Sequence, residues 1–410
     1  MAKGKRRKTK KSPAKKSQAR LLAVLRTICI IAVVLVLLVI AAQRFGNITF
    51  SSVSDYFSTL LSSAKSGDGY PYYFETTKVD TVLPIGSDLL VVSEDSTFVL
   101  DSTARKISNE QHSLSDPVVR SVNGRALFLD IGENAYQIQS KTKVLYSGSF
   151  PQKLLTGTIG KDGTVALVSR GESAQTQLTV LNRNQKEIFV WNCANENIIA
   201  VALSDNGKRA AVSAVGAKDG ELYSKVHIFD FDYAEPIASF NYNTAVSGVE
   251  FLSCDRLLIT GTNVFELVED DTKTLEEDLS LNTLSNVYTS DGNQTVAVLS
   301  KYGSSTAKII RVYNKKGEKL FETELSESVK GVSCDERYIS VLTDNDLYSY
   351  NTKGELVGKH SVDADSIRPF TDGKYTYVWT MSTIQCYKTT ETEEETVPSE
   401  TQTESASQTQ

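Results

Sequence analysis

The sequence predicts an all-β domain behind a single transmembrane helix, and three observations support this fold class. An uncharged apolar segment lies near the N-terminus, within residues 21–43. A pattern of two apolar strands around a polar turn recurs eight times between residues 83 and 380. Residues 1–44 carry twelve basic and no acidic side chains, which leaves 32 basic against all 50 acidic residues in the remainder, a net charge of −18. The chain therefore divides into a basic N-terminal part and an acidic domain.

Residues 21–43 are predicted to span a membrane. Arg26 is their only charged residue, and about 20 residues rising 1.5 Å each cross a hydrocarbon core of roughly 30 Å. The Arg26 guanidinium can reach the headgroups from the start of the helix. A buried core helix would need polar positions at helical spacing, which this segment lacks. A cleavable signal peptide is the other alternative, but its apolar region usually has only ~7–15 residues. We expect an uncleaved anchor.

The charges beside this helix predict its orientation. Ten Lys and Arg side chains precede the helix, and only Arg44 follows it closely. Under the positive-inside rule, residues 1–20 form a cytoplasmic tail, and the bulk of this single-pass membrane protein is extracytoplasmic. The tail is expected to set the topology and to contact anionic lipid. Nucleic acid is not an expected partner, because the acidic domain would repel its phosphates.

Two segments flank the domain, which is expected to span residues 70–388. Residues 44–69 are predicted to form a linker with a short amphipathic helix that ends at SGDG (66–69). Residues 389–410 hold ten Ser or Thr and six Glu, which predicts a disordered tail. The apolar residues of the short helix recur at three- and four-residue spacings: Ile48, Val53, Tyr56, Phe57, Leu60 and Leu61.

The repeated pattern has the period of a β-propeller blade. Each pattern is followed by a second hairpin, so each period holds four strands. A single twisted four-stranded sheet leaves both faces uncovered, whereas radial stacking covers both. The small and β-branched residues of VALVS (165–169) and AAVSA (210–214) suit crowded inner strands. EKLFETEL (318–325) alternates with charged residues, which suits a solvent-exposed outer strand. The turn residues that mark the period are 35 to 49 residues apart, about 41 on average: Asp88, Asn123, Asp162, Asn206, Asp255, Asp291, Asp335 and Asp372.

The number of patterns predicts eight blades, with seven as the alternative. After the last pattern only STIQCYK (382–388) remains, which is enough for three strands in the last blade. We expect YYFETT (72–77) to supply the missing outer strand from the other end of the domain. Pairing between the two ends of the domain would close the ring.

The strand–Asp–Gly–strand pattern resembles WD40-like and pyrroloquinoline-quinone-like propellers over residues 75–388. Regular Trp-Asp and Gly-His dipeptides are absent, and Trp191 and Trp379 are the only tryptophans. The basic tail, anchor, short helix and GDGYP before a propeller also resemble an uncharacterised group of membrane-anchored propeller proteins from clostridia and relatives. These resemblances imply a propeller architecture. They do not imply a catalytic or binding role for any residue.

The sequence contains few residues in patterns typical of catalytic or metal sites. His112, His227 and His360 fall in different repeats, without the spacing of a metal site. The acidic runs at 269–271 and 276–278 could act as paired carboxylates in glycan hydrolysis. We expect instead that they are solvated residues at the outer edge of the domain. The turns at 204–207 and 343–346 lack a complete calcium loop, and they are interpreted as Asx turns. We assign no catalytic, cofactor-binding or metal-binding residue, and we expect no cofactor.

The cysteines and the glycan-acceptor patterns have simple interpretations. Asn293-Gln294-Thr295 and Asn47-Ile48-Thr49 fit the acceptor pattern, but position 293 falls in the turn of the sixth repeat. The cysteines beyond the anchor are widely spaced, and we expect isolated thiols rather than two disulfides, as suits a Gram-positive bacterium: Cys193, Cys254, Cys334 and Cys386.

Together these features indicate a membrane-tethered binding or scaffolding module at the cell envelope, and not an enzyme. Its expected partners are the lipid bilayer, through residues 21–43, and other envelope proteins, on the propeller faces. The alternative is an envelope hydrolase that acts on a glycan or small molecule with carboxylates in the central funnel. A third hypothesis is a sensor that passes an external signal to residues 1–20.

Overall fold

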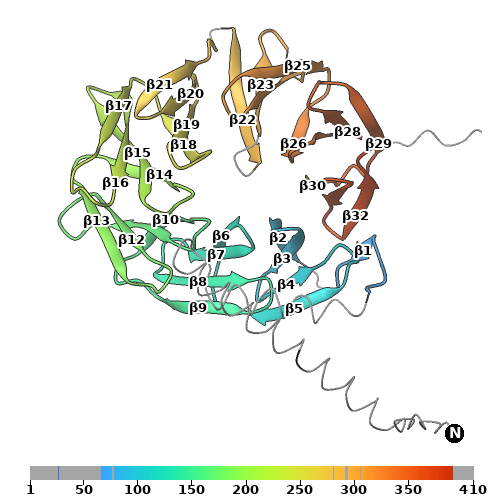
Figure 1. Cartoon of the computed structure of the whole chain (residues 1–410), viewed down its shortest axis with the longest axis horizontal. Coiled ribbons are helices and arrows are strands. Elements are labelled where there is room, and N and C mark those ends of the chain that lie inside the picture. Colours follow the sequence, from blue (N-terminus) through green and yellow to red (C-terminus); the bar gives the residue numbers. More distant parts are fainter. Residues whose placement is uncertain are drawn as a thin grey trace, which may run out of the picture. The chain divides into compact units, whose positions relative to one another are not determined.

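The computed structural model describes Arg26 and residues 66–390, except positions 76, 77, 280, 291–293 and 305. Eight four-stranded antiparallel sheets, the blades, stand radially around a common centre (Figure 1). The prediction of eight blades is confirmed, and the seven-bladed alternative is wrong. The transmembrane helix, the short amphipathic helix and the tail beyond Thr390 fall outside the described residues. Within the described part of the chain, no helix has the length and apolarity that a membrane crossing requires.

Blades one to four follow one another along the chain, and in each the first strand lies nearest the centre (Figure 1). Blade one consists of β2 (Val79–Ile85), β3 (Asp88–Ser93), β4 (Ser96–Leu100) and β5 (Lys106–Gln111). Blade two consists of β6 (Pro117–Val122), β7 (Arg125–Asp130), β8 (Ala135–Ser140) and β9 (Val144–Ser149). Blade three consists of β10 (Leu154–Ile159), β11 (Val165–Arg170), β12 (Thr176–Leu181) and β13 (Glu187–Cys193). Blade four consists of β14 (Asn197–Leu203), β15 (Arg209–Lys218), β16 (Glu221–Asp230) and β17 (Ala238–Tyr242).

Blades five to seven repeat this order, and blade eight takes a strand from the N-terminal side. Blade five consists of β18 (Val246–Phe251), β19 (Arg256–Gly261), β20 (Val264–Glu269) and β21 (Thr272–Glu276). Blade six consists of β22 (Asn282–Ser290), β23 (Gln294–Lys301), β24 (Lys308–Asn314) and β25 (Lys319–Leu325). Blade seven consists of β26 (Val329–Cys334), β27 (Tyr338–Thr343), β28 (Asp346–Asn351) and β29 (Leu356–Ser361). Blade eight consists of β30 (Arg368–Asp372), β31 (Tyr375–Trp379), β32 (Thr383–Lys388) and β1 (Tyr72–Tyr73).

In most blades the second strand is the most deeply buried. All six residues of β3 are buried, as are the first five residues of β11. A second strand has a strand on each side and a neighbouring blade on each face. Side chains that point to either face are therefore shielded from water. VALVS and AAVSA both lie in second strands, next to the innermost strand. Continuous apolar sequence thus marks the position that is enclosed on every side.

The hydrophobic core lies between blades. Leu90 and Val99 of blade one pack with Ala126 and Phe128 of blade two. The other clusters join neighbouring blades in the same way, including blades three and four and blades six and seven. Each blade therefore depends on its neighbours for burial of its apolar faces.

The ring is closed by the strand from the N-terminal side of the domain. Tyr72 pairs with Ile384 and Tyr73 with Thr383, and the Phe74 N–H donates to the Ser382 carbonyl (3.0 Å). The Tyr72 ring also contacts Phe98 of blade one, with ring centroids 6.0 Å apart. The predicted pairing of the two ends is confirmed, although only two of the expected residues form the strand.

The two faces of the ring differ in their connections. The first face carries the turns that join the first strand to the second and the third to the fourth; the second face carries the remaining turns and the connectors between blades. On the first face, Lys141 Nζ pairs with Asp88 Oδ2 (2.7 Å), which links blades one and two. Lys161 Nζ pairs with Asp205 Oδ1 (3.0 Å), which links blades three and four. The Asx turn predicted at 204–207 is confirmed, because Asn206 Oδ1 accepts the Lys208 N–H (3.1 Å).

The four described cysteines are free thiols, so the prediction of isolated thiols is confirmed for them. Cys193 is buried, whereas Cys254 is exposed in a turn of the first face. Burial raises the pKa of Cys334 to about 12 and that of Cys386 to about 11. These two thiols therefore stay protonated at neutral pH, and they are weak nucleophiles.

Glu196, in the connector between blades three and four, is a buried carboxylate. It accepts hydrogen bonds from Lys225 Nζ (2.7 Å) and Tyr223 OH (3.0 Å). Burial alone would raise the pKa of Glu196, but these hydrogen bonds outweigh it and hold the pKa below the ordinary value of 4.5. Charged Glu196 thus stabilises the fold above about pH 4.5, and this contribution is lost as the pH falls below that value.

We expect Glu196→Gln to lower the free energy of unfolding at pH 7 by roughly 1–3 kcal/mol, because hydrogen bonds to a charged group are lost. The variant should lose less stability than the wild type between pH 7 and pH 3, because the wild-type contribution is lost only below about pH 4.5. Urea titrations of the full-length protein at several pH values measure both effects. Glu187→Gln, at an exposed position of β13, is the matched control. Parallel pH curves for wild type and Glu196→Gln would contradict the assignment.

Candidate functional site

A cleft of about 970 Å³ lies between blades five and six on the second face. Its blade-five wall contains Asn263, from the turn between β19 and β20, and the acidic residues 276–278, of which Glu276 ends β21. Its blade-six wall contains Leu281 and the 301–304 turn after β23. Because both walls are built from turns and connectors, they can present side chains without disturbing the strands beneath.

The two blades separate toward this face because they are held together elsewhere. A hydrogen bond from Thr289 to Glu250 joins their innermost strands, β22 and β18, near the first face, but the backbones of these two strands lie farther apart than those of β14 and β18 or of β26 and β30. Phe265 and Tyr313 stack with ring centroids 5.0 Å apart in the core between blades five and six. The apolar contact between the two blades is thus made by the middle strands, and the cleft lies beyond it.

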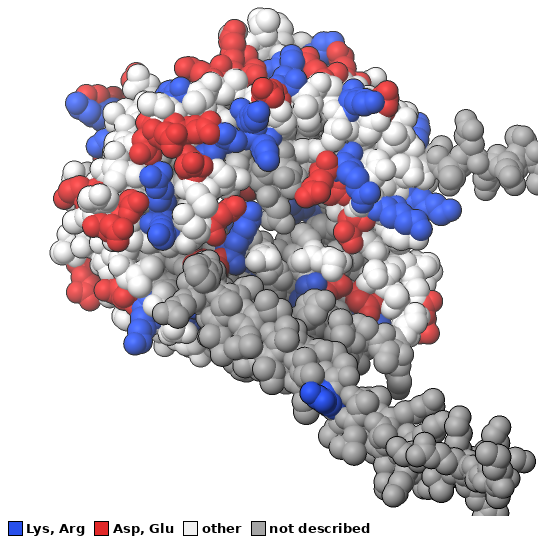
Figure 2. Space-filling view, in the orientation of Figure 1, with Lys and Arg blue, Asp and Glu red and all other residues white. Residues whose placement is uncertain are grey.

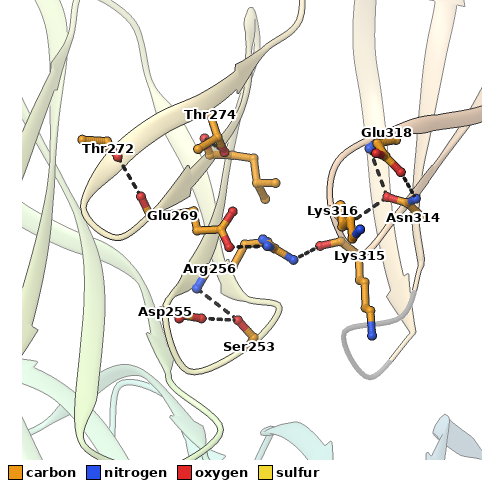
Figure 3. A network of polar contacts seen from close by, with 11 residues as sticks. Ser253, Asp255, Arg256, Glu269, Thr272, Thr274, Asn314, Lys315, Lys316 and Glu318 are labelled. Carbon is orange, nitrogen blue, oxygen red and sulfur yellow. Dashed lines mark hydrogen bonds and ion pairs between the residues drawn. The ribbon is translucent and has the colours of Figure 1, made fainter.

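On the first face, Arg256 ties the same two blades together (Figure 3). From the start of β19, its guanidinium pairs with Glu269 and donates to the Lys315 carbonyl in the turn between β24 and β25. That turn approaches blade five closely at Gly317, where φ is +81° and an added Cβ would lie 3.0 Å from Leu267 Cδ2. The blade five–six boundary is thus closed on the first face and open on the second.

An ion-pair network supports the wall of the cleft. Arg311 Nη1 contacts Glu277 Oε2 (2.9 Å), and its Nε contacts Glu322 Oε2 (2.7 Å). Burial alone would lower the pKa of Arg311, but the hydrogen bond to Glu322 keeps this pKa above its usual value. Glu277 is therefore held across the boundary by a permanently charged partner.

Hydrogen bonds between side chains and the backbone hold the blade-six rim in place. Ser304 Oγ accepts the Ala307 N–H (3.0 Å), and Asn282 Oδ1 accepts the Tyr302 N–H (3.4 Å). Two large side chains project from this rim: Tyr302 is 85% exposed and Leu281 is 72% exposed. A fixed backbone with projecting apolar side chains is suited to contact a partner molecule.

The cleft has an acidic character. Glu276, Glu277 and Asp278 line it together with one basic residue, Lys301, which pairs with Glu324 (2.7 Å). The Glu276 side chain lies on the side of blade five that faces blade four, because Glu276 pairs with Glu266, whose carboxylate accepts a hydrogen bond from Tyr242 OH (2.6 Å). Figure 2 shows that acidic side chains also gather over blade five on the visible face. Because Glu277 is bonded to Arg311 and Asp278 also has a partner, the described residues leave no free carboxylate in the cleft for a cationic ligand.

The histidines do not come together. Each lies in a different blade, as the sequence indicated, and each has a local hydrogen bond. His112 Nε2 contacts the Ser93 carbonyl (3.1 Å), His227 Nδ1 contacts Ser239 Oγ (2.8 Å), and His360 Nε2 contacts the Lys388 carbonyl (2.7 Å). Within the described ranges, no three His, Cys, Asp or Glu side chains are placed to hold a metal ion.

The two acidic runs have different positions. Residues 269–271 form the turn between β20 and β21, where Asp270 and Asp271 have positive φ angles, as in a solvated turn. Residues 276–278 line the cleft, which sequence reasoning did not distinguish from an acidic edge. Tyr302 was also missed, although an aromatic residue beside Gly303 in a turn is a signal for an exposed contact residue.

The eight radial sheets define the class of protein as a β-propeller. The chain belongs to a family of unknown function, DUF5711, whose model matches residues 71–388. No curated protein matches the sequence.

Solved structures with this fold are similar at low sequence identity. The C-terminal WD40 domain of Sif2 has a TM-score of 0.53 and 12% identity, over 77% of this chain and 98% of that one. A eukaryotic initiation factor has a TM-score of 0.54 and 11% identity, over 78% of this chain and 88% of that one. BamB from Moraxella catarrhalis has a TM-score of 0.47 and 13% identity, over 77% of this chain and 100% of that one. The first two similarities show a shared fold and nothing further.

Proposed function

We propose that this protein is a membrane-tethered propeller that binds other proteins of the cell envelope through its second face. The propeller fold is consistent with a protein-interaction or scaffold module. The charge-poor segment 21–43 and the basic residues before it support tethering with the propeller outside the cytoplasm. Binding rather than catalysis is favoured, because Glu277, at the centre of the acidic run, is bonded to Arg311.

The observation that carries this proposal is the distribution of exposed apolar side chains. Four turns that join a second strand to a third place an apolar side chain in solvent at or beside the turn: Ile131, Leu222, Tyr302 and Met381. All four turns lie on the second face, and Leu281 adds a fifth apolar side chain from a connector. The first face also exposes Tyr233 and Leu356, but the three most exposed of the described large apolar side chains, Tyr302, Met381 and Leu281, lie on the second face. Such side chains on one face indicate a protein-binding surface.

Photocrosslinking in intact cells tests the binding face. A benzoylphenylalanine residue replaces Tyr302 or Met381 on the second face, or Tyr233, which is 63% exposed in a turn of the first face. We expect discrete protein adducts from positions 302 and 381 and none from position 233. Adducts from position 233 alone, or from none of the three positions, would overturn the proposal.

The natural thiol of Cys254 tests the location of the propeller, because it is free and exposed. A membrane-impermeant maleimide should label Cys254 in intact cells, and Cys254→Ser should abolish the labelling. Labelling that requires cell lysis would place the propeller in the cytoplasm.

A further inference from the structure

We propose that the protein bound by the second face carries a basic surface in which Lys and Arg side chains surround apolar ones. This inference rests on the proposed function and specifies the chemistry of that partner. The surface that would contact the partner consists of the turns and connectors of the second face, where exposed acidic residues lie near exposed apolar side chains.

The second face is strongly acidic. Among the described residues, its turns and connectors hold fourteen acidic side chains and two basic ones, Lys78 and Lys153. Both lysines are already paired, Lys78 with Asp80 (3.3 Å) and Lys153 with Glu133 (3.5 Å). When the residues that end the strands on this face are counted too, there are eighteen acidic and seven basic residues. The negative charge of the second face is therefore not neutralised within the domain.

The first face has no such imbalance. Its described turns hold twelve acidic and twelve basic side chains. Some of these charges pair across blades, as Lys161 does with Asp205 (3.0 Å). Since the turns of both faces are surface segments of the same repeats, the acidic excess is a property of the second face and not of the repeat.

In blade eight an unpaired carboxylate lies beside the most exposed methionine. The Ile367 N–H donates to the Trp379 carbonyl (2.8 Å), which holds the connector that contains Asp365 next to the turn that contains Met381. Met381 is 75% exposed. Asp365 is also exposed, as is Glu94 in the corresponding turn of blade one, and no described residue forms an ion pair with either carboxylate.

Two basic residues near this connector are already engaged. Lys330 Nζ donates to the Ala364 carbonyl (2.7 Å) and lies 3.8 Å from the Asp344 carboxylate. The Arg368 guanidinium lies over the Phe370 ring, 5.8 Å from its centroid. A Lys or Arg of the partner, placed beside an apolar side chain that covers Met381, would supply the missing ion pair.

The charge of the second face also restricts the class of partner. Opposite charge speeds association and like charge disfavours it, so an anionic lipid surface or a nucleic acid is a poor ligand for this face. The attraction extends over a Debye length of about 8 Å at physiological ionic strength. Binding of a basic partner should therefore weaken as salt is added.

Charge reversal combined with photocrosslinking tests the chemistry of the partner. Benzoylphenylalanine at position 381 of the full-length protein forms the adduct in intact cells. Asp365→Lys combined with Glu94→Lys should lower the yield of that adduct by about fivefold, because two carboxylates near the contact become cations. Added salt should lower the wild-type yield when isolated membranes are irradiated.

A matched pair of substitutions controls for the change in net charge. Asp232→Lys combined with Glu235→Lys makes the same change in a turn of the first face, where both residues are exposed. This variant should form the adduct as the wild type does. Because all four positions are exposed, the urea unfolding midpoints of the three proteins should agree. Mass spectrometry of the adduct should find more Lys and Arg than Asp and Glu in the partner segment joined to position 381.

Two results would overturn the proposal. They are an equal adduct yield from the wild type and from Asp365→Lys with Glu94→Lys, and a partner segment with more acidic than basic residues. The proposed function fails separately, when positions 302 and 381 of the wild type give no protein adduct. Adducts that are insensitive to the charge reversal would keep the binding face and reject a basic partner.

Discussion

Replacing Phe128 by alanine is expected to lower the free energy of unfolding by about 3–5 kcal/mol, the usual cost of removing a buried aromatic ring. Phe128 is fully buried in β7, the second strand of blade two. It packs against Leu90 and Val99 of blade one and lies near the His112 ring, with centroids 6.2 Å apart. The substitution would leave a cavity between two blades, where neither sheet can move inward without losing its other neighbour.

Guanidinium titration of the full-length protein, followed by the fluorescence of Trp191 and Trp379, measures this loss. Phe128→Leu should cost less, within about 1.5 kcal/mol, because most of the apolar volume is kept. Ile188→Ala, at an exposed position of β13, should change stability by less than about 0.5 kcal/mol. A Phe128→Ala variant as stable as Ile188→Ala would contradict the interblade core.

The second large effect is expected at the ring closure. Tyr72→Ala combined with Phe74→Ala should destabilise the protein by about 3 kcal/mol, because two half-buried rings that pack around blades eight and one are lost. The loss should be concentrated in blade eight, since the backbone pairs of β1 with β32 involve only Tyr72 and Tyr73. Hydrogen exchange of β30–β32 should therefore accelerate more than that of β14–β17.

Tyr73 provides the matched control for the closure. It lies in the same short strand, but its side chain is 68% exposed. Tyr73→Ala should leave both the unfolding midpoint and hydrogen exchange in blade eight close to the wild-type values. Uniform acceleration over all eight blades in the double variant would show that the closure does not act locally.

The repeated turns made the architecture predictable from sequence. Asn123 and Asp162 mark positions where the chain must reverse, and a regular recurrence of such positions fixes the number of blades. The closure was predictable for a related reason, because the last repeat is one strand short. Of the acceptor tripeptide at 293–295, Gln294 and Thr295 are buried residues at the start of β23, and Asn293 lies outside the described residues.

The cleft could not be predicted in the same way. Its existence depends on how far two neighbouring sheets diverge, and this divergence arises from contacts such as those of Arg256 and Gly317 with the adjacent blade. Residues 276–278 follow a charged outer strand, so an acidic edge was the simplest interpretation. The helices predicted at 21–43 and 44–69 stay predictions, because they lie outside the described residues.

The closure also has a consequence for the order of events during synthesis. Tyr72 emerges from the ribosome 312 residues before its partner Ile384. Until then the Phe98 side of blade one has no neighbour, although Phe370, Tyr377 and Trp379 will later cover it. The nascent chain therefore carries an uncovered apolar surface for nearly the whole time of translation, and such surfaces aggregate readily. We expect a chain of this kind to fold better with a chaperone, or with rapid elongation, until its last blade is made.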